Sequence, residues 1–171
     1  MQNLSIILSH IPTWVWAILA FIVVMGFIQS RDQRMSRQRL MILPLVWLAF
    51  GAWGVKNSFG LGLDTLAAWG VGLVLSLRLV KLSGWPGGAR FDVETQRYFV
   101  PGSWLPLGLM LGIFVAKFAL GMSLGFHPEL ASNSVFAISF SALFGTLSGV
   151  FLGRSRNILG RAPAPLTAAQ A

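Results

Sequence analysis

The chain has 171 residues, of which 55% are hydrophobic and only 11% are charged, whereas about a quarter of the residues in an ordinary soluble domain carry a charge. Its apolar residues come in blocks about as long as a bilayer is thick, and the mean hydropathy is +0.71, which is typical of an integral membrane protein. The net charge of +8 would indicate a polyanion partner in a soluble chain, but in a membrane protein it more often reports topology. We therefore expect no nucleic-acid partner. Because the chain contains no cysteine, disulfides, covalent haem attachment and iron–sulfur ligation are excluded.

The order of apolar and polar segments predicts an all-α membrane protein, a bundle of five transmembrane helices. The expected spans are, in chain order, about 11–28, 40–55, 63–80, 104–126 and 134–153. They form a single integral membrane domain over residues 1–153. Since the connection between the second and third spans is short, we expect these two helices to be antiparallel neighbours. The Ala/Pro-rich segment 154–171 is interpreted as a cytoplasmic, mostly disordered tail.

The distribution of basic residues predicts the orientation of the bundle. Lys56 falls on one side and Lys117 inside a span, whereas all other basic residues share the opposite side. These are Arg31, Arg34, Arg37, Arg39, Arg78, Lys81, Arg90, Arg97, Arg154, Arg156 and Arg161. Because Lys and Arg are retained in the cytoplasm, the N-terminus is expected outside and the C-terminus inside a bacterial inner membrane. The basic face is also expected to attract anionic lipid headgroups.

Between the third and fourth spans, residues 89–101 alternate between polar and apolar side chains on both sides of a polar turn. This pattern predicts a short cytoplasmic β-hairpin. A lone hairpin is marginally stable in water, so its apolar face should lie on the membrane interface or on the helix ends. Arg90, Asp92 and Arg97 would then pair with one another or with lipid phosphate. The hairpin is either a structural clip between two helices or a docking surface for a partner or a lipid.

Small residues recur at every fourth position of the fifth span, a pattern that allows another helix backbone to approach closely. This small-residue stripe consists of Ala137, Ser141, Gly145, Gly149 and Gly153. Shorter lines of the same kind occur in the fourth span, Gly108 with Gly112 and Ala116 and, beside it, Gly121 with Gly125, and in the third span, Ala68 with Gly72 and Ser76. We interpret these lines as internal packing surfaces of the bundle. Homodimerisation or contact with another membrane protein is the alternative.

Lys117 is the one basic residue deep inside a predicted span. A lysine there costs at least ~2.5 kcal/mol on insertion scales and lies too far from either interface to snorkel. It should therefore face the bundle and pair with a carboxylate, for which Asp64 at the outer start of the third span is the available candidate. Such a pair is structural, or else Lys117 belongs to an ion, proton or substrate site.

No arrangement of residues for a known reaction is present: the sequence contains no Walker loop, HExxH motif or dinucleotide fingerprint. His10, His127, Asp64 and Glu129 share the outer side, but their spacing matches no metal motif. We therefore expect no enzyme, cofactor or metal site. The favoured function is a non-enzymatic structural or accessory membrane protein, and the alternative is a small transporter or channel that uses Lys117.

Several segments resemble a family of uncharacterised proteobacterial inner-membrane proteins with a domain of unknown function. They are the Trp14-Val15-Trp16 opening of the first span, Leu40 to Leu45 after the arginine-rich loop, Arg90-Phe91-Asp92, and Val100 to Leu107. The resemblance covers about residues 8–152. More distantly, the basic first loop, the short helices and the cytoplasmic hairpin are similar to CcdC-type membrane proteins. Neither resemblance supplies catalytic residues, so both bear on fold and location alone.

Overall fold

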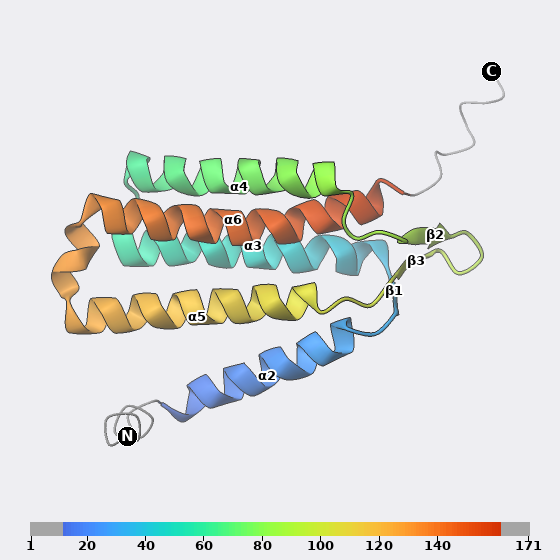
Figure 1. Ribbon diagram of the computed structural model, residues 1–171, viewed down its shortest axis with the longest axis horizontal. Coiled ribbons are helices and arrows are strands. Elements are labelled where there is room, and N and C mark those ends of the chain that lie inside the picture. The colour runs from blue at the N-terminus through green and yellow to red at the C-terminus, as the bar shows by residue number, and fades with distance from the viewer. Residues whose placement is uncertain (1–11, 162–171) are drawn as a thin grey trace.

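The structure is a computed structural model that describes residues 12–161. This part of the chain is mostly helical, with five α-helices, one short 3-10 helix and one small sheet (Figure 1). The elements in chain order are α2 (Thr13–Gln29), β1 (Gln33–Met35), α3 (Arg37–Phe59), α4 (Leu63–Ser83), β2 (Arg90–Asp92), β3 (Arg97–Val100), α5 (Leu105–Phe126), η1 (Pro128–Ser132) and α6 (Ser134–Leu159). The predictions for residues 1–11 and 162–171 lie outside the described residues.

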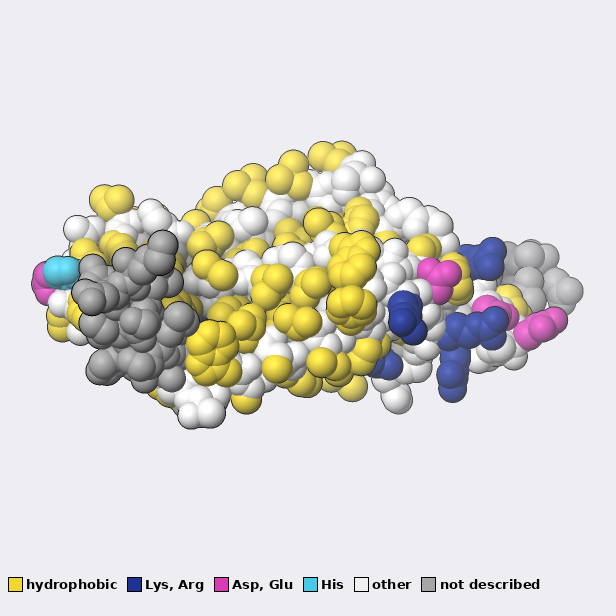
Figure 2. All heavy atoms as spheres, turned by 60° about the horizontal axis from the view of Figure 1, so that its bottom comes forward, with side chains coloured by type: hydrophobic (Ala, Val, Ile, Leu, Met, Phe, Trp, Pro, Cys, Tyr) yellow, Lys and Arg dark blue, Asp and Glu magenta, His cyan; other side chains and the backbone are white. Residues whose placement is uncertain are grey.

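Four of these helices, α3, α4, α5 and α6, are long and apolar enough to cross a membrane. The fifth, α2, has 17 residues, which at 1.5 Å per residue gives about 25 Å, somewhat less than the ~30 Å hydrocarbon core of a bilayer. Apolar side chains cover the middle of the molecule, and charged side chains gather at its two ends (Figure 2). The sheet end carries the Lys and Arg side chains visible on this face.

The helices pack in two groups: α3 and α4 lie against α6, and α2 lies against α5. The most extensive packing in the structure is between α6 and α4, followed by that between α6 and α3, while α2 packs mainly on α5 (Figure 1). The second and third expected spans correspond to α3 and α4, which make few contacts with each other. The expectation that they are packed neighbours is therefore wrong. Instead α6 lies between them. A short turn fixes where two helices meet but not which helix covers their facing sides.

The predicted hairpin is present, and the structure adds a strand to it. Strands β2 and β3 pair antiparallel, with Phe91 opposite Tyr98. Strand β1, from the loop between α2 and α3, pairs antiparallel with the other edge of β3, with Arg34 opposite Phe99. The sheet therefore has three strands in the order β1-β3-β2, and the expectation of an all-α fold with an isolated hairpin is corrected to a mostly helical fold with a small sheet.

The inner face of this sheet lies on the ends of two helices. Tyr98 and Val100 of β3 are buried on the same face, and Met35 of β1 joins them. They pack against Leu40 of α3 and Ile158 of α6. The apolar face of the hairpin was expected either on the membrane interface or on the helix ends, and in the structure it lies on the helix ends. This packing removes the instability of a lone hairpin, because a third strand and a helix surface cover its apolar side.

Several helices extend beyond the expected spans by three residues or more: α3 at both ends, and α4 and α6 at their C-terminal ends. Helix α3 begins at Arg37, capped by the Ser36 side chain, which accepts a hydrogen bond from the Arg39 N–H at 3.4 Å, so Pro44 lies inside the helix. Helix α6 continues to Leu159, beyond the span expected to end at residue 153. The first six residues of the predicted tail are therefore helical.

Candidate functional site

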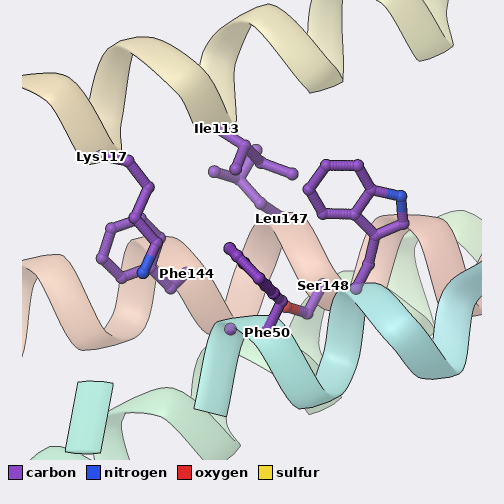
Figure 3. A pocket seen from close by; sticks show the side chains of 8 residues that line it. Phe50, Ile113, Lys117, Phe144, Leu147 and Ser148 are labelled. Carbon is purple, nitrogen blue, oxygen red and sulfur yellow. The ribbon is translucent and has the colours of Figure 1, made fainter. Parts of the chain in front are cut away.

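Lys117 lies near the middle of α5, and its side chain extends toward α6 and α3 (Figure 3). The Nζ atom is 4.4 Å from the centroid of the Phe144 ring on α6. Gly54 on α3 makes this position available, because a Cβ atom at residue 54 would meet Nζ and would lie 3.0 Å from Cε. The Lys117 side chain therefore fits between three helices because it packs on the Phe144 ring and because Gly54 has no side chain.

The hollow beside Lys117 is small and mostly apolar (Figure 3). Its volume is about 10 Å³, which is about the minimum that holds a single water molecule. It is lined by Trp47, Phe50 and Gly51 of α3, by Ile113 and Lys117 of α5, and by Phe144, Leu147 and Ser148 of α6. A space of this size admits no organic substrate, and its walls supply few polar groups besides the ammonium.

Lys117 and Asp64 are not joined by an ion pair in this structure. Within residues 12–161 there is a single ion pair, in which Nδ1 of His127 lies 3.0 Å from Oε1 of Glu129. Asp64 is exposed in the first turn of α4, and its Oδ1 lies so close to Gly62 that a Cβ there would contact it. The ring of Phe144 thus takes the place expected for a carboxylate, and a cation–π contact contributes about 0.5–2 kcal/mol as desolvation increases.

The small-residue stripe of α6 faces α4. A Cβ atom at Gly145 would collide with the backbone of Trp69, and one at Gly149 would lie 2.5 Å from the carbonyl oxygen of Leu73. A Cβ at Gly153 would lie 2.9 Å from Cβ of Val80. Ala137 and Ser141, at the other end of the stripe, are buried as well. Close backbone approach of this kind adds van der Waals contact between membrane helices.

The glycines of α5 do not share this arrangement. An added Cβ at any of them would meet no atom within 4 Å; they are Gly108, Gly112, Gly121 and Gly125. Our interpretation of these lines as internal packing surfaces is therefore wrong for the glycines of α5, whereas Ala116 of α5 and Gly72 and Ser76 of α4 are buried. A sequence pattern of small residues does not distinguish a helix that is packed on its neighbour from one whose glycines are open.

Sequence reasoning missed a second group of polar residues, at the C-terminal end of α6. Arg154 is buried, and its guanidinium lies 5.4 Å from the centroid of the Trp85 ring. The Asn157 side-chain N–H groups donate to the carbonyl oxygens of Val80 at 2.8 Å and Trp85 at 2.9 Å. Arg161 donates to two further carbonyl oxygens of the loop after α4. These residues hold that loop against α6. They lie in the segment interpreted as tail, where no residue pattern distinguished them from their neighbours.

The remaining predicted polar groups lie at the two ends of the bundle. His127 and Glu129 are exposed, and hydrogen bonds from its own backbone N–H and from the His127 ring lower the pKa of the Glu129 carboxyl. No group of three His, Asp or Glu side chains is brought together in residues 12–161, and His10 lies outside them. In the sheet, Arg90 lies 4.8 Å from the centroid of the Phe99 ring instead of pairing with Asp92.

Comparison with known proteins adds one match. A family model with the description "Family of unknown function (DUF6622)" matches residues 1–168. No curated protein and no solved structure matches the chain.

Proposed function

The chain belongs to this family of unknown function, and we propose that it acts as a non-enzymatic structural or accessory component of a bacterial inner membrane. The observation that carries the proposal is the surrounding of Lys117. Its ammonium rests on an aromatic ring, and the hollow beside it has a volume of about 10 Å³. A transporter needs a site that admits its cargo, whereas a lysine enclosed in this way supports a role in holding α3, α5 and α6 together.

The surface of the molecule supports a multipass membrane location. Large apolar side chains are exposed along the helices, among them Phe21, Phe50 and Leu79, and such a surface is stable when it faces lipid. The basic residues of the sheet end support the orientation with the C-terminus in the cytoplasm. In this orientation the three-stranded sheet is a cytoplasmic feature, fixed to the ends of α3 and α6. A rigid polar surface beside the membrane suits a role in binding another membrane protein or a second copy of the chain.

The alternative function is a small transporter or channel. It is favoured by one observation: the Lys117 ammonium has no carboxylate partner in the part of the chain that the structure describes. A charged group inside a membrane is costly and is often retained for ion or proton movement. Under this alternative the hollow would enlarge in a second conformation of the protein.

The topology is tested with reporter fusions. Reporters that are active in the cytoplasm should work at Ala171 and within residues 31–39, whereas periplasmic reporters should work within residues 57–62 and near Ser132. A periplasmic signal at Ala171 contradicts the orientation. Failure of the chain to fractionate with membranes contradicts the membrane location itself.

The choice between an accessory protein and a transporter is tested in proteoliposomes. The full-length protein should give no proton or ion flux above that of protein-free vesicles. Lys117→Met is compared with Lys56→Met, which removes a lysine from an exposed position near the end of α3. A flux that disappears in Lys117→Met and persists in Lys56→Met would replace our proposal with the transporter.

A further inference from the structure

A groove lies beside the contact between the two most closely packed helices, α4 and α6, at their basic ends. Its volume is about 200 Å³, far above the ~10–15 Å³ that one water molecule requires. The groove is lined by Leu77, Arg78 and Lys81 of α4 and by Gly153, Arg156 and Asn157 of α6. Gly153 and Leu77 provide apolar walls, and the basic side chains surround them. The groove is thus larger than the hollow beside Lys117 and has a different chemistry.

The groove brings together three cations, Arg78, Lys81 and Arg156, and all three are exposed. None of them has an ion-pair partner within residues 12–161, where the single ion pair lies at the opposite end of the bundle. The neighbouring Asn157 and Arg161 differ in this respect, because their side chains donate to backbone carbonyl oxygens of the loop after α4. The polar residues at this end therefore divide into Asn157 and Arg161, which hold the loop after α4, and three cations that line the groove.

Two of the three carboxylates at the same end of the molecule are engaged elsewhere, and the third, Glu94, does not line the groove. Asp32 accepts a hydrogen bond from the Gly102 N–H at 2.8 Å. Asp92 accepts hydrogen bonds from the backbone N–H groups of Glu94 and Thr95, in the turn between β2 and β3. No acidic residue lines the groove. Three unneutralised cations around one concavity repel one another, and an anion bound among them would remove that repulsion.

We infer that this α4–α6 groove binds the phosphate group of an anionic phospholipid, with Arg78, Lys81 and Arg156 as its ligands. Two guanidinium groups offer paired N–H donors that match phosphate oxygens, and the lysine adds a mobile point charge. Basic pockets between helices on the cytoplasmic side of a membrane have the character needed for such headgroups. The inference rests on the proposed membrane orientation, which places this end of the bundle among the cytoplasmic headgroups.

The surroundings of the groove favour a lipid over free phosphate. Val74 lies one helical turn before Arg78, toward the middle of the bundle, and its side chain is 48% exposed. Val71 and Leu75 are also exposed on α4. An acyl chain attached to a phosphate in the groove would run along this apolar surface, so that the headgroup and the chain are both accommodated. Free phosphate would gain nothing from it.

The test uses the full-length protein, purified in detergent and stripped of lipid. Phosphatidylglycerol, phosphatidylcholine and inorganic phosphate are added separately, and both the melting temperature and the bound lipid, by native mass spectrometry, are measured. We expect phosphatidylglycerol alone to raise the melting temperature. In the triple variant Arg78→Gln, Lys81→Gln, Arg156→Gln, its affinity should fall on the order of tenfold to a hundredfold, as expected from the loss of three basic contacts.

A matched control removes three other exposed charges from the same end of the molecule. The triple variant Arg37→Gln, Arg39→Gln, Arg97→Gln has the same net charge as the groove variant, but its residues do not line the groove. It should bind phosphatidylglycerol nearly as the wild type does. Equal losses in the two triple variants would overturn the inference, because they would show a general attraction to positive charge.

A conservative variant covers the case in which the groove triple does not fold. Arg78→Lys with Arg156→Lys keeps the three charges and loses the paired donors, so we expect a several-fold weaker affinity with an unchanged melting temperature in the absence of lipid. Undiminished affinity would overturn the assignment of the two arginines as ligands. If inorganic phosphate protects as well as phosphatidylglycerol does, the ligand is not a lipid. A protein that inserts with the expected topology and yet binds no phosphatidylglycerol overturns the groove site alone and leaves the proposed function standing.

Discussion

The packing of α6 on α4 is most directly tested by adding one methyl group at Gly145. The added Cβ would lie 2.8 Å from the carbonyl carbon of Trp69 and 3.0 Å from its Cα, and it would also meet the carbonyl oxygen. A backbone cannot rotate away as a side chain can, so the two helices must move apart. Overpacking of this kind costs about 1–3 kcal/mol, and we place this site at the upper end.

A second contribution acts in the opposite direction. Alanine in place of glycine inside a helix gains ~1 kcal/mol because it restricts the unfolded backbone. The net loss for Gly145→Ala is therefore about 2 kcal/mol. The matched control is Gly112→Ala on α5, where an added Cβ meets nothing within 4 Å. That variant should retain the gain and be more stable than the wild type by about 0.5–1 kcal/mol.

The assay is thermal unfolding of the purified protein in one detergent, with the wild type and both variants at equal concentration. A change of 2 kcal/mol corresponds to about 4–8 °C for a chain of this length, on the scale of soluble domains. Gly145→Ala should melt lower than the wild type, and Gly112→Ala should melt at the same temperature or higher. A Gly145→Ala protein as stable as Gly112→Ala would refute the close contact between α6 and α4.

Three further changes have expected outcomes. Lys117→Met should lower the stability by about 0.5–2 kcal/mol, because the contact of the ammonium with the Phe144 ring is lost, and this effect should add to that of Asp64→Asn within ~0.5 kcal/mol; a double variant more stable than this sum would restore the pairing. Asn157→Ala should cost about 1–3 kcal/mol, because two partly buried carbonyl oxygens lose their donor, and hydrogen exchange in the loop after α4 should rise; unchanged exchange would contradict this role. Hydrogen bonds from Thr95 lower the pKa of Asp92 below 3.8. The stability that this carboxylate adds to the β2–β3 turn is therefore present above pH 3.8 and is lost as the pH falls through the lowered pKa. Asp92→Asn should remove this acid dependence of hydrogen exchange in the turn, and an unaltered pH profile would count against it.

The helices were predictable because each long apolar block must satisfy its backbone hydrogen bonds internally. Helix α4 begins at Leu63, as expected, and α5 ends at Phe126. The end of α6 was missed because Arg154 closes the apolar block. A helix can continue beyond its apolar block without apolar residues, and here Asn157 gives it contacts on the loop after α4.

The sheet and the lysine site show what one sequence leaves open. Strand β1 has three residues, too few for an alternating pattern, and its partner strand is distant in the chain, so only the hairpin had a local signal. For Lys117, the charge inside an apolar block indicated an unusual residue but not its neighbours. A carboxylate is the expected partner of a lysine inside a membrane span, whereas Lys117 contacts the ring of Phe144 and occupies the space left by Gly54.

The sheet also constrains the order in which the molecule can assemble during synthesis. Strand β1 leaves the ribosome early, but its partner β3 follows only after about 60 further residues, which include α3 and α4. At about 5–20 residues per second, this delay is about 3 to 12 s. Throughout that time β1 has an unpaired edge, while α3 and α4 are being made. Pairing with β3 then allows the contacts from Met35 through Val100 to Ile158, so that this end of the molecule becomes fixed only after α6, the last helix of the described residues, has been made.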